Sequence, residues 1–402
     1  MAETKLSCFW HGPDLGRDTR AAVSLHGHTN RSKESLQFIP ELARKGPMLH
    51  EALEKQCKKA RFPVDFSRAY WTPPLTPQLA YETEKDQIES LGLKSLVSLT
   101  DHDNIEAPLM LRAERETAQT PISLEWSVPY SGTIFHLGVH NLPSGQAQAI
   151  MEELAAYTQN PSDRWAIELL AMLDGFPDVL VVFNHPLWTQ TCVGVHRDDQ
   201  VLERFLECGV QFLHAFEINA TRSTRENNQV AKLAKQWERP LVSGGDRHGC
   251  AASGALNLTS AETFVEFVSE IRLEQRSHVL LMPQYTEPVS LRTTRTLLDV
   301  IRDYPEYPSG SRRWDERVFH PDGTGGPDRA LSSLWKAPPA FLEKILSGIR
   351  LLENATVQGA MLRMFRRSVA EKVPEDVPRT RTLETIPAEA VARKAVSSEA
   401  LS

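Results

Sequence analysis

Several protein classes are excluded by what this 402-residue sequence lacks. The formal net charge is −7, so no basic surface supports nucleic-acid binding. No apolar run approaches the roughly 18 residues that a membrane-spanning helix needs. The first five residues lead into no apolar signal-peptide segment, which argues against secretion. We therefore expect a cytoplasmic protein with neither a membrane nor a nucleic-acid partner. The sequence does not indicate an oligomeric state.

The cysteines and the nucleotide-binding motifs give further exclusions. The five cysteines are scattered and contain no Cys-x-x-Cys pair, which favours reduced thiols over a disulfide framework or a zinc knuckle. Neither a Rossmann fingerprint nor a Walker loop is present. A composition of 41% apolar and 24% charged residues is that of an ordinary globular protein with ample material for a core.

Short apolar segments alternate with helix-like segments along most of the chain. This alternation predicts an α/β fold with a parallel sheet. Several of the apolar segments are almost uniformly apolar, as expected for strands covered on both faces. The predicted strands lie at 21–25, 94–100, 121–125, 133–139, 179–183, 212–218, 240–243 and 278–282.

Histidines and carboxylates occur near the ends of many of these strands. His26 and His28 end the first strand, and side chains two residues apart on an extended segment share a face. Imidazole and carboxylate ligands suit Zn, Mn or Fe. So many potential ligands exceed the needs of one four-coordinate ion, which predicts a cluster of two or three divalent ions. The candidates are His26, His28, His102, Glu125, His136, His185, Glu217, Asp246 and His248.

The ordered set of motifs resembles the PHP (polymerase and histidinol phosphatase) domain of metal-dependent phosphoesterases. The resemblance covers about residues 21–282. Its motifs are Leu25-His26-Gly27-His28-Thr29 with Ser32, Leu99-Thr100-Asp101-His102-Asp103, Glu125, His136-Leu137-Gly138, Asn184-His185-Pro186, Glu217-x-Asn219 and Gly245-Asp246-x-His248-Gly249.

The resemblance implies a distorted (β/α)7 barrel with a site for two or three metal ions. His26, His28, Glu125 and Asp246 would hold one ion. His136 and His185 would hold a second, bridged by Glu125, and His102 and His248 a third. Asp101 and Asp103 would lie near the site as catalytic residues that orient ligands or handle protons.

One position departs from the family pattern. Family members usually carry Asp after the serine that corresponds to Ser32, whereas this chain has Lys33-Glu34. Three outcomes are open: Glu34 takes over as a ligand, Lys33 replaces the charge of the third ion and binds substrate phosphate, or Lys33 faces solvent. Arg247 and Arg222 are further candidates for substrate binding because arginine suits phosphate or carboxylate.

The sequence predicts four regions. Residues 1–20 form a leader, and residues 21–283 form the barrel with an insertion at about 40–79. Residues 284–373 form a mainly helical C-terminal extension, interpreted as an appendage or as a crossing over the barrel base. The tail at 374–402 is polar and aperiodic, which predicts disorder.

The leading hypothesis is a metal-dependent hydrolase of a small-molecule phosphomonoester or phosphodiester, working through a metal-bridging hydroxide. Two alternatives stay open: an amidohydrolase or esterase that uses the same cluster, and a degenerate PHP module with a regulatory or scaffolding role.

Overall fold

The structure of the protein is a computed structural model. It describes residues 2–12, 15, 18–37, 39–44, 50, 51, 54, 55, 58, 65–188, 199–320, 326–334, 338, 340–354, 356, 357 and 359. The last part of the predicted C-terminal extension, from residue 360, and the predicted tail lie outside this part of the chain.

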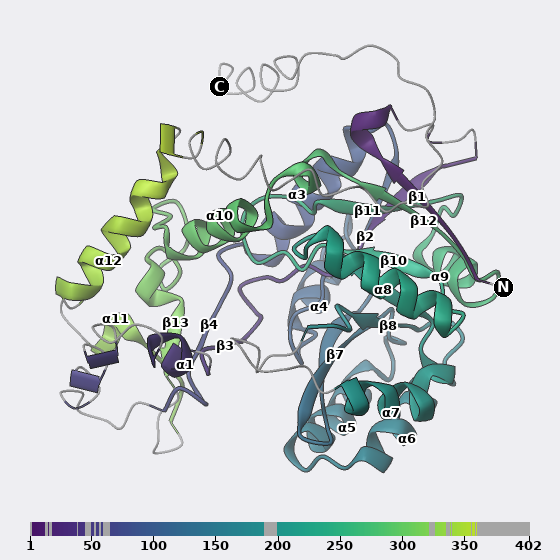
Figure 1. The fold of residues 1–402 in the computed structure, drawn as a ribbon, viewed down its shortest axis with the longest axis horizontal. Helices are drawn as coiled ribbons and strands as arrows, with labels where there is room; N and C mark the ends of the chain where they lie inside the picture. Colours follow the sequence, from purple (N-terminus) through teal and green to yellow (C-terminus); the bar gives the residue numbers. More distant parts are fainter. Residues whose placement is uncertain are drawn as a thin grey trace.

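Two five-stranded sheets form the centre of the fold (Figure 1). The first has the order β1 (Glu3–Cys8), β12 (Arg276–Leu281), β11 (Ala255–Thr259), β2 (Ala21–Ser24), β5 (Lys94–Val97). The second has the order β10 (Leu241–Gly244), β9 (Ala215–Asn219), β8 (Leu180–Asn184), β7 (Thr133–His140), β6 (Leu124–Tyr130).

The two sheets meet at two isolated parallel bridges, between Gly27 and Arg247 and between His102 and Glu125. The described strands therefore form two open sheets joined at single residues, instead of one continuously hydrogen-bonded barrel. The predicted α/β class is confirmed, but the sheets are not wholly parallel. β7 pairs antiparallel with β6 and β8, and β11, which the sequence analysis missed, pairs antiparallel with β2 and β12.

Helices cover the outer faces of the sheets (Figure 1). Side-chain caps fix the start of several of them, as when Ser162, Ser223 and Thr263 accept N–H groups of the first turn. Their bounds are α3 (Pro77–Glu89), α4 (Glu106–Arg112), α5 (Ala147–Gln159), α6 (Asp163–Asp174), α7 (Asp199–Gly209), α8 (Thr224–Gln236) and α9 (Phe264–Arg272).

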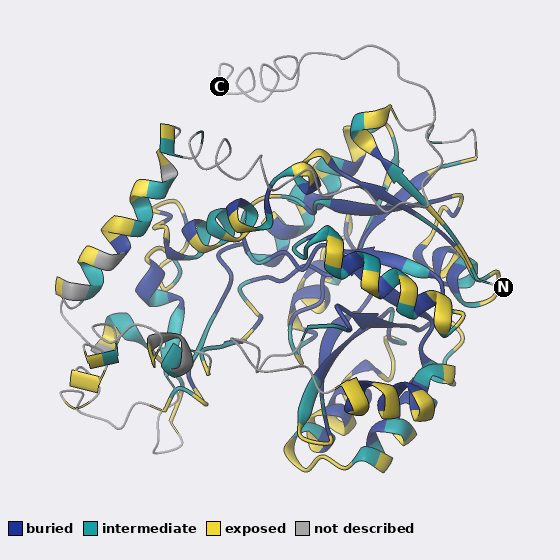
Figure 2. Ribbon diagram, viewed as in Figure 1, coloured by how far each residue is buried: buried dark blue, intermediate teal, exposed yellow. Residues whose placement is uncertain are grey.

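The strands of the large sheets are mostly buried, and the helices around them are exposed on their outer sides (Figure 2). The alternation of side chains along the strands divides the core into layers. Leu124, Trp126 and Val128 of β6 pack in the layer that the outer helices cover. Val23 and Val182 belong to a separate cluster with Phe267 of α9. Residues out of phase with the outer layer, including Glu125 and His136, are thereby placed on the opposite face of their sheet.

A small four-stranded sheet joins the insertion to the C-terminal region. Its order is β14 (Arg329–Ala330), β13 (Val318–His320), β4 (Tyr70–Trp71), β3 (Glu34–Ser35). It lies beside α1 (Ile39–Arg44), α10 (Val289–Ile301), α11 (Leu331–Leu334) and α12 (Ala340–Arg350), to one side of the large sheets (Figure 1).

Two sequence-based assignments change as a result. The segment assigned to a leader contains β1, which pairs in parallel with β12 because its partly buried face, ending in Cys8, packs on the core. The C-terminal extension was interpreted as an appendage or as a crossing over the barrel base. Instead, β13 pairs with β4. β4 in turn pairs with β3, and β3 carries the candidate ligand Glu34. No helix in the described part of the chain is long and apolar enough to cross a membrane.

Candidate metal centre

The candidate ligands converge because most of them lie at the ends of neighbouring strands. His26, His185 and Asp246 follow β2, β8 and β10 directly or closely, while Glu125 and His136 lie within β6 and β7. The bridge between His102 and Glu125 and the bridge from Gly27 to Arg247 bring the two sheets together at this point. All nine strand-end candidates are buried or nearly so.

Three of these residues have an unusual backbone conformation. The φ angles are 62° at His26, 26° at His185 and 44° at Asp246. Side-chain-bearing residues rarely adopt positive φ, and such strain is concentrated at functional sites. Here it coincides with the points where strands end and imidazole or carboxylate groups turn toward one centre.

Glu125 lies at the middle of the cluster. Its Oε2 is 3.1 Å from His26 Nε2 and 3.3 Å from both His28 Nε2 and His102 Nε2. Its Oε1 is 3.1 Å from His185 Nε2 and 3.5 Å from His136 Nδ1. One carboxylate therefore faces imidazoles from both sheets, which is the arrangement a bridging ligand requires.

Glu34 occupies the place left by the departure at Lys33. Its Oε2 is 3.1 Å from His248 Nε2 and 3.4 Å from His102 Nε2, and its Oε1 is 3.7 Å from His28 Nδ1. Of the three outcomes left open by the sequence, the geometry favours the takeover by Glu34.

Each of three carboxylates has one oxygen held by the chain and the other facing imidazoles. Ser32 Oγ donates to Glu34 Oε1 at 2.6 Å, and Asn184 Nδ2 donates to Glu125 Oε1 at 3.0 Å. Arg222 Nη2 and Thr221 Oγ1 donate to Oδ2 of Asp246, whose Oδ1 lies 3.4–3.7 Å from nitrogens of three histidines. Such supporting hydrogen bonds orient metal ligands and leave the second oxygen free to coordinate.

Glu217 supports the cluster from behind. Its Oε1 accepts from His26 Nδ1 at 2.6 Å, which leaves Nε2 of that ring directed at Glu125. Its Oε2 accepts the backbone N–H of His185 at 2.7 Å. A Cβ on Gly244 would lie 1.4 Å from Glu217 Oε1, so any other residue there would displace the Glu217 carboxylate.

The electrostatics reflect the crowding of opposite charges. Burial alone would raise the pKa of Glu125, but the imidazoles of His26, His102 and His136 lower this pKa well below its usual range. The pKa of Glu34 is likewise lowered against the effect of burial, chiefly by His248 and His102. Burial lowers the pKa of His136 to about 4. Against the effect of burial, the facing carboxylates raise the pKa of His102 to about 10 and also raise the pKa values of His26 and His28. The ionised carboxylates are in the state that metal ligands need, and a cation bound here would displace the protons from these three imidazoles.

Unpaired buried atoms test whether the cluster fits a metal. Among the described residues, His26 Nε2, His28 Nε2, Glu125 Oε2 and both ring nitrogens of His136 have no hydrogen-bond partner. Buried polar atoms are normally paired, so this concentration requires an explanation, and bound cations supply one. Within the described chain, four sets of side chains place one ligand atom each within 4.8 Å of one another: His28-Glu34-His102-His248, His26-His28-Asp246, His26-His185-Glu217 and His102-Glu125-His136. The residues are consistent with a metal site.

Two residues predicted to be catalytic have other partners. Both carboxylate oxygens of Asp101 accept hydrogen bonds from Thr29, at 2.6 and 2.7 Å, so this buried side chain holds the loop after His28. Asp103 is exposed and accepts the N–H of Ser127 at 2.8 Å. Neither belongs to a ligand set among the described residues, and the structure assigns them to loop support.

The three predicted substrate-binding cations differ in position. Arg247 is only 5% exposed and pairs with buried Glu84 at 2.9 Å, so it is a structural residue beneath the centre. Lys33 contacts Asp328 at 3.0 Å instead of the ligand cluster. Arg222 holds Asp246 and stacks over Trp188 with its guanidinium carbon 5.0 Å from the ring centroid, which leaves it at the edge of the cluster.

Sequence reasoning missed several supporting residues. Trp188 lies 5.1 Å from the His185 ring and 5.5 Å from the His136 ring, measured between centroids, and Trp71 lies 5.8 Å from the His248 ring. The motif Asn184-His185-Pro186 was the one sequence signal that could have indicated the contact between Asn184 and Glu125. Nothing in the local sequence around Trp71 or Asp328 indicates their places near the cluster.

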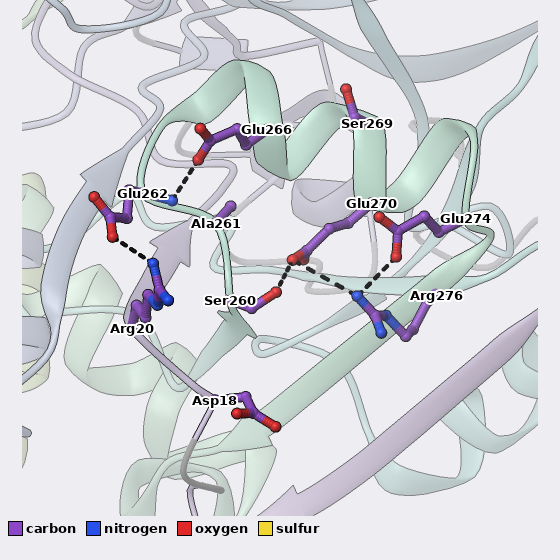
Figure 3. A pocket seen from close by; sticks show the side chains of 10 residues that line it. All are labelled: Asp18, Arg20, Ser260, Ala261, Glu262, Glu266, Ser269, Glu270, Glu274 and Arg276. Carbon is purple, nitrogen blue, oxygen red and sulfur yellow. Dashed lines mark hydrogen bonds and ion pairs between the residues drawn. The ribbon is translucent and has the colours of Figure 1, made fainter.

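A cavity of about 840 Å³ elsewhere in the molecule is not a candidate site (Figure 3). Arg20 pairs there with Glu262, and Arg276 pairs with Glu270 and Glu274. Both cationic side chains of the lining are therefore already neutralised, and no lining residue belongs to the ligand cluster.

No protein-family model and no curated protein matches this sequence. Three solved structures show distant similarity. An amidohydrolase from Chromobacterium violaceum with bound sulfate and no metal is 12% identical, with 57% of this chain and 88% of that chain covered and a TM-score of 0.35. PsfC from Pseudomonas syringae is 14% identical, with 66% and 93% covered and a TM-score of 0.37.

The third structure, described as a metal-dependent phosphoesterase from Bifidobacterium adolescentis, is 12% identical, with 49% of this chain and 91% of that chain covered and a TM-score of 0.31. At such scores the similarities support no conclusion about chemistry. The chain is a mixed α/β protein, distantly similar in structure to these three, with buried His/Glu/Asp sets that are consistent with a metal site.

Proposed function

We propose that this protein is a metal-dependent hydrolase that acts on phosphate esters of small molecules. The observation that carries the proposal is the convergence of buried histidines and carboxylates, several of whose facing atoms have no hydrogen-bond partner in the described chain. The resemblance of the motifs to the PHP domain points to the same chemistry. The two bridges between the sheets support a distorted seven-stranded barrel, in which β2, β5 and β6 to β10 surround the centre.

The candidate ligands would form three ion positions. His26, His28 and Asp246 would hold one ion, His136 and His185 a second, and Glu34, His102 and His248 a third, with Glu125 between them. When bound, divalent ions such as Zn, Mn or Fe activate water and stabilise the charge that develops on phosphoryl oxygens. Glu217, Asn184 and Ser32 keep the ligating groups oriented.

Arg222 favours an anionic substrate. Its guanidinium lies between Asp246 and the Trp188 ring, and that ring in turn contacts the rings of His136 and His185. A rigid planar cation at the edge of a metal cluster can donate N–H groups to two oxygens of a phosphoryl group. The same site could accommodate a carboxylate, so the substrate class has to be decided by assay.

Metal content and hydrolysis together test the proposal. Protein loaded with Mn²⁺, Zn²⁺ or Fe²⁺ is assayed on phosphomonoesters, phosphodiesters, carboxylic esters and amides. We expect metal-dependent turnover of phosphate esters. Turnover confined to esters or amides would favour the amidohydrolase alternative, and substoichiometric metal at every position would favour a scaffolding module.

A matched pair of variants links the activity to the cluster. His136 and His140 are both buried, lie four residues apart on β7 and share one face of the strand, but only His136 belongs to a ligand set in the described chain. His140 instead contacts Ser98 Oγ at 2.8 Å. We expect His136→Gln to lower both metal content and turnover and His140→Gln to preserve the metal content. Equal loss in both would contradict the assignment.

A further inference from the structure

Lys33 and Glu34 pose an electrostatic problem because they are adjacent. Glu34 is buried and is the one carboxylate in the set His28, Glu34, His102 and His248. Successive side chains on an extended segment point to opposite faces, and the side chain of Lys33 is accordingly 60% exposed. A lysine ammonium on a flexible stem can nevertheless turn and pair with a neighbouring carboxylate. Such a pair would compete with a cation for Glu34.

Asp328, 295 residues further along the chain, forms an ion pair with Lys33. Its Oδ2 accepts from Lys33 Nζ at 3.0 Å and from Tyr70 Oη at 2.5 Å. The ammonium also lies 4.7 Å from the centroid of the Tyr70 ring. The carboxylate and the ring both contact the ammonium from the side of the small sheet.

The small sheet fixes these partners relative to Glu34. In the register of β3 and β4, Glu34 faces Trp71 and Ser35 faces Tyr70. In the register of β4 and β13, Tyr70 faces Phe319, and their rings stack at 5.1 Å. The Lys33–Asp328 contact is therefore built into the same sheet that carries the ligand.

Ion pairs between exposed groups contribute little to folding stability. Asp328 combines the ion pair with a hydroxyl hydrogen bond and a neighbouring ring, which is enough to bias where one flexible side chain lies. The effect of this contact should therefore appear at the metal position of Glu34 more than in the stability of the fold.

We propose that Asp328 is a positioning residue that keeps the Lys33 ammonium from pairing with Glu34. Glu34 Oε2 then stays available to a cation held with His102 and His248. This inference rests on the proposed metal centre and extends it, because it assigns a role at that centre to the C-terminal region.

The test is a titration of chelator-stripped, full-length protein with Mn²⁺, followed by calorimetry and by metal analysis after dialysis. We expect Asp328→Asn to bind one of its ions about tenfold or more weakly, because an ammonium near a carboxylate in a partly buried site is a strong competitor. Lys33→Gln should bind Mn²⁺ at least as tightly as the wild type. The double variant D328N/K33Q should recover wild-type affinity, because the competitor is gone.

The matched control is Glu106→Gln, which removes an exposed carboxylate that contacts Arg31 on the same loop as Lys33. It should leave Mn²⁺ binding unchanged. Wild-type affinity in Asp328→Asn would overturn the proposal, as would a loss that D328N/K33Q does not recover. A wild-type protein that binds no Mn²⁺ at all would refute the metal centre itself, which is a different result from equal binding by wild type and variant.

Discussion

Replacing Arg247 with methionine tests whether this arginine is a structural residue or a substrate-binding one. Arg247 is 5% exposed and Glu84 is 1% exposed. Arg247 Nε donates to Glu84 Oε1 at 2.9 Å, and Nη1 donates to the carbonyl of Gly249 at 3.0 Å. The substitution keeps most of the side-chain volume and removes the cation. It therefore leaves the Glu84 carboxylate buried without its counter-charge.

Breaking a buried ion pair by removing one partner costs about 3–5 kcal/mol. Glu84 would retain hydrogen bonds from Ser24 Oγ at 2.9 Å and from the N–H of Ser253 at 3.2 Å, which favours the lower end of this range. For a chain of 402 residues, a loss of about 3 kcal/mol corresponds to a fall in Tm of roughly 4 °C.

Urea denaturation and scanning calorimetry measure this loss, and R247M/E84Q provides the control. The double variant buries no charge, so we expect it to recover most of the free energy of unfolding. A free energy of unfolding within about 0.5 kcal/mol of the wild type in Arg247→Met, together with a raised KM, would refute the structural role. It would restore Arg247 as a substrate-binding residue.

Three further predictions concern the cluster and the core. Gly244→Ala should displace Glu217, lower bound metal and cost about 1–3 kcal/mol in denaturation, whereas Gly348→Ala, in open space on α12, should do neither. Adding a chelator should lower Tm, and Mn²⁺ at 100 times its Kd should restore about 2.7 kcal/mol of unfolding free energy; a Tm indifferent to both would count against the centre. Burial lowers the pKa of His214 to about 4, so between pH 6.5 and 4 the unfolded chain holds a proton that the folded chain lacks. Unfolding free energy should therefore fall by up to about 3 kcal/mol as pH drops through this window, and this part of the slope should vanish in His214→Gln.

The ligand positions could be predicted from the sequence because they depend on local rules. Period-2 alternation places Glu125 and His136 on one side of their strands, and apolar segments that end in His or Asp indicate the edge where strands terminate. These rules do not determine which strands are neighbours. β11 is short and was left without an assignment, and its antiparallel pairing with β2 depends on contacts between segments more than 200 residues apart.

The roles of charged residues were harder to predict for the same reason. Arg247 lies between two ligand positions in sequence, yet its partner is Glu84, 163 residues away. Asp101 belongs to the same motif as His102, but its oxygens are taken up by Thr29. Spacing shows which side chains share a strand end, whereas burial and long-range pairing decide whether each faces the cluster or supports a loop.

The small sheet also fixes the order in which the centre can be completed during synthesis. β3, with Glu34, pairs with β4 near residue 70, but β4 pairs with β13 only after residues 318–320 have been made. At roughly 5–20 residues per second, a growing chain waits about 15–60 seconds between the appearance of Lys33 and that of Asp328, 295 residues later. Once His248 has been made, the ribosome-bound chain carries all of its candidate histidine ligands without the finished sheet that fixes Glu34. The full ligand set is therefore complete only when synthesis of the chain is well advanced.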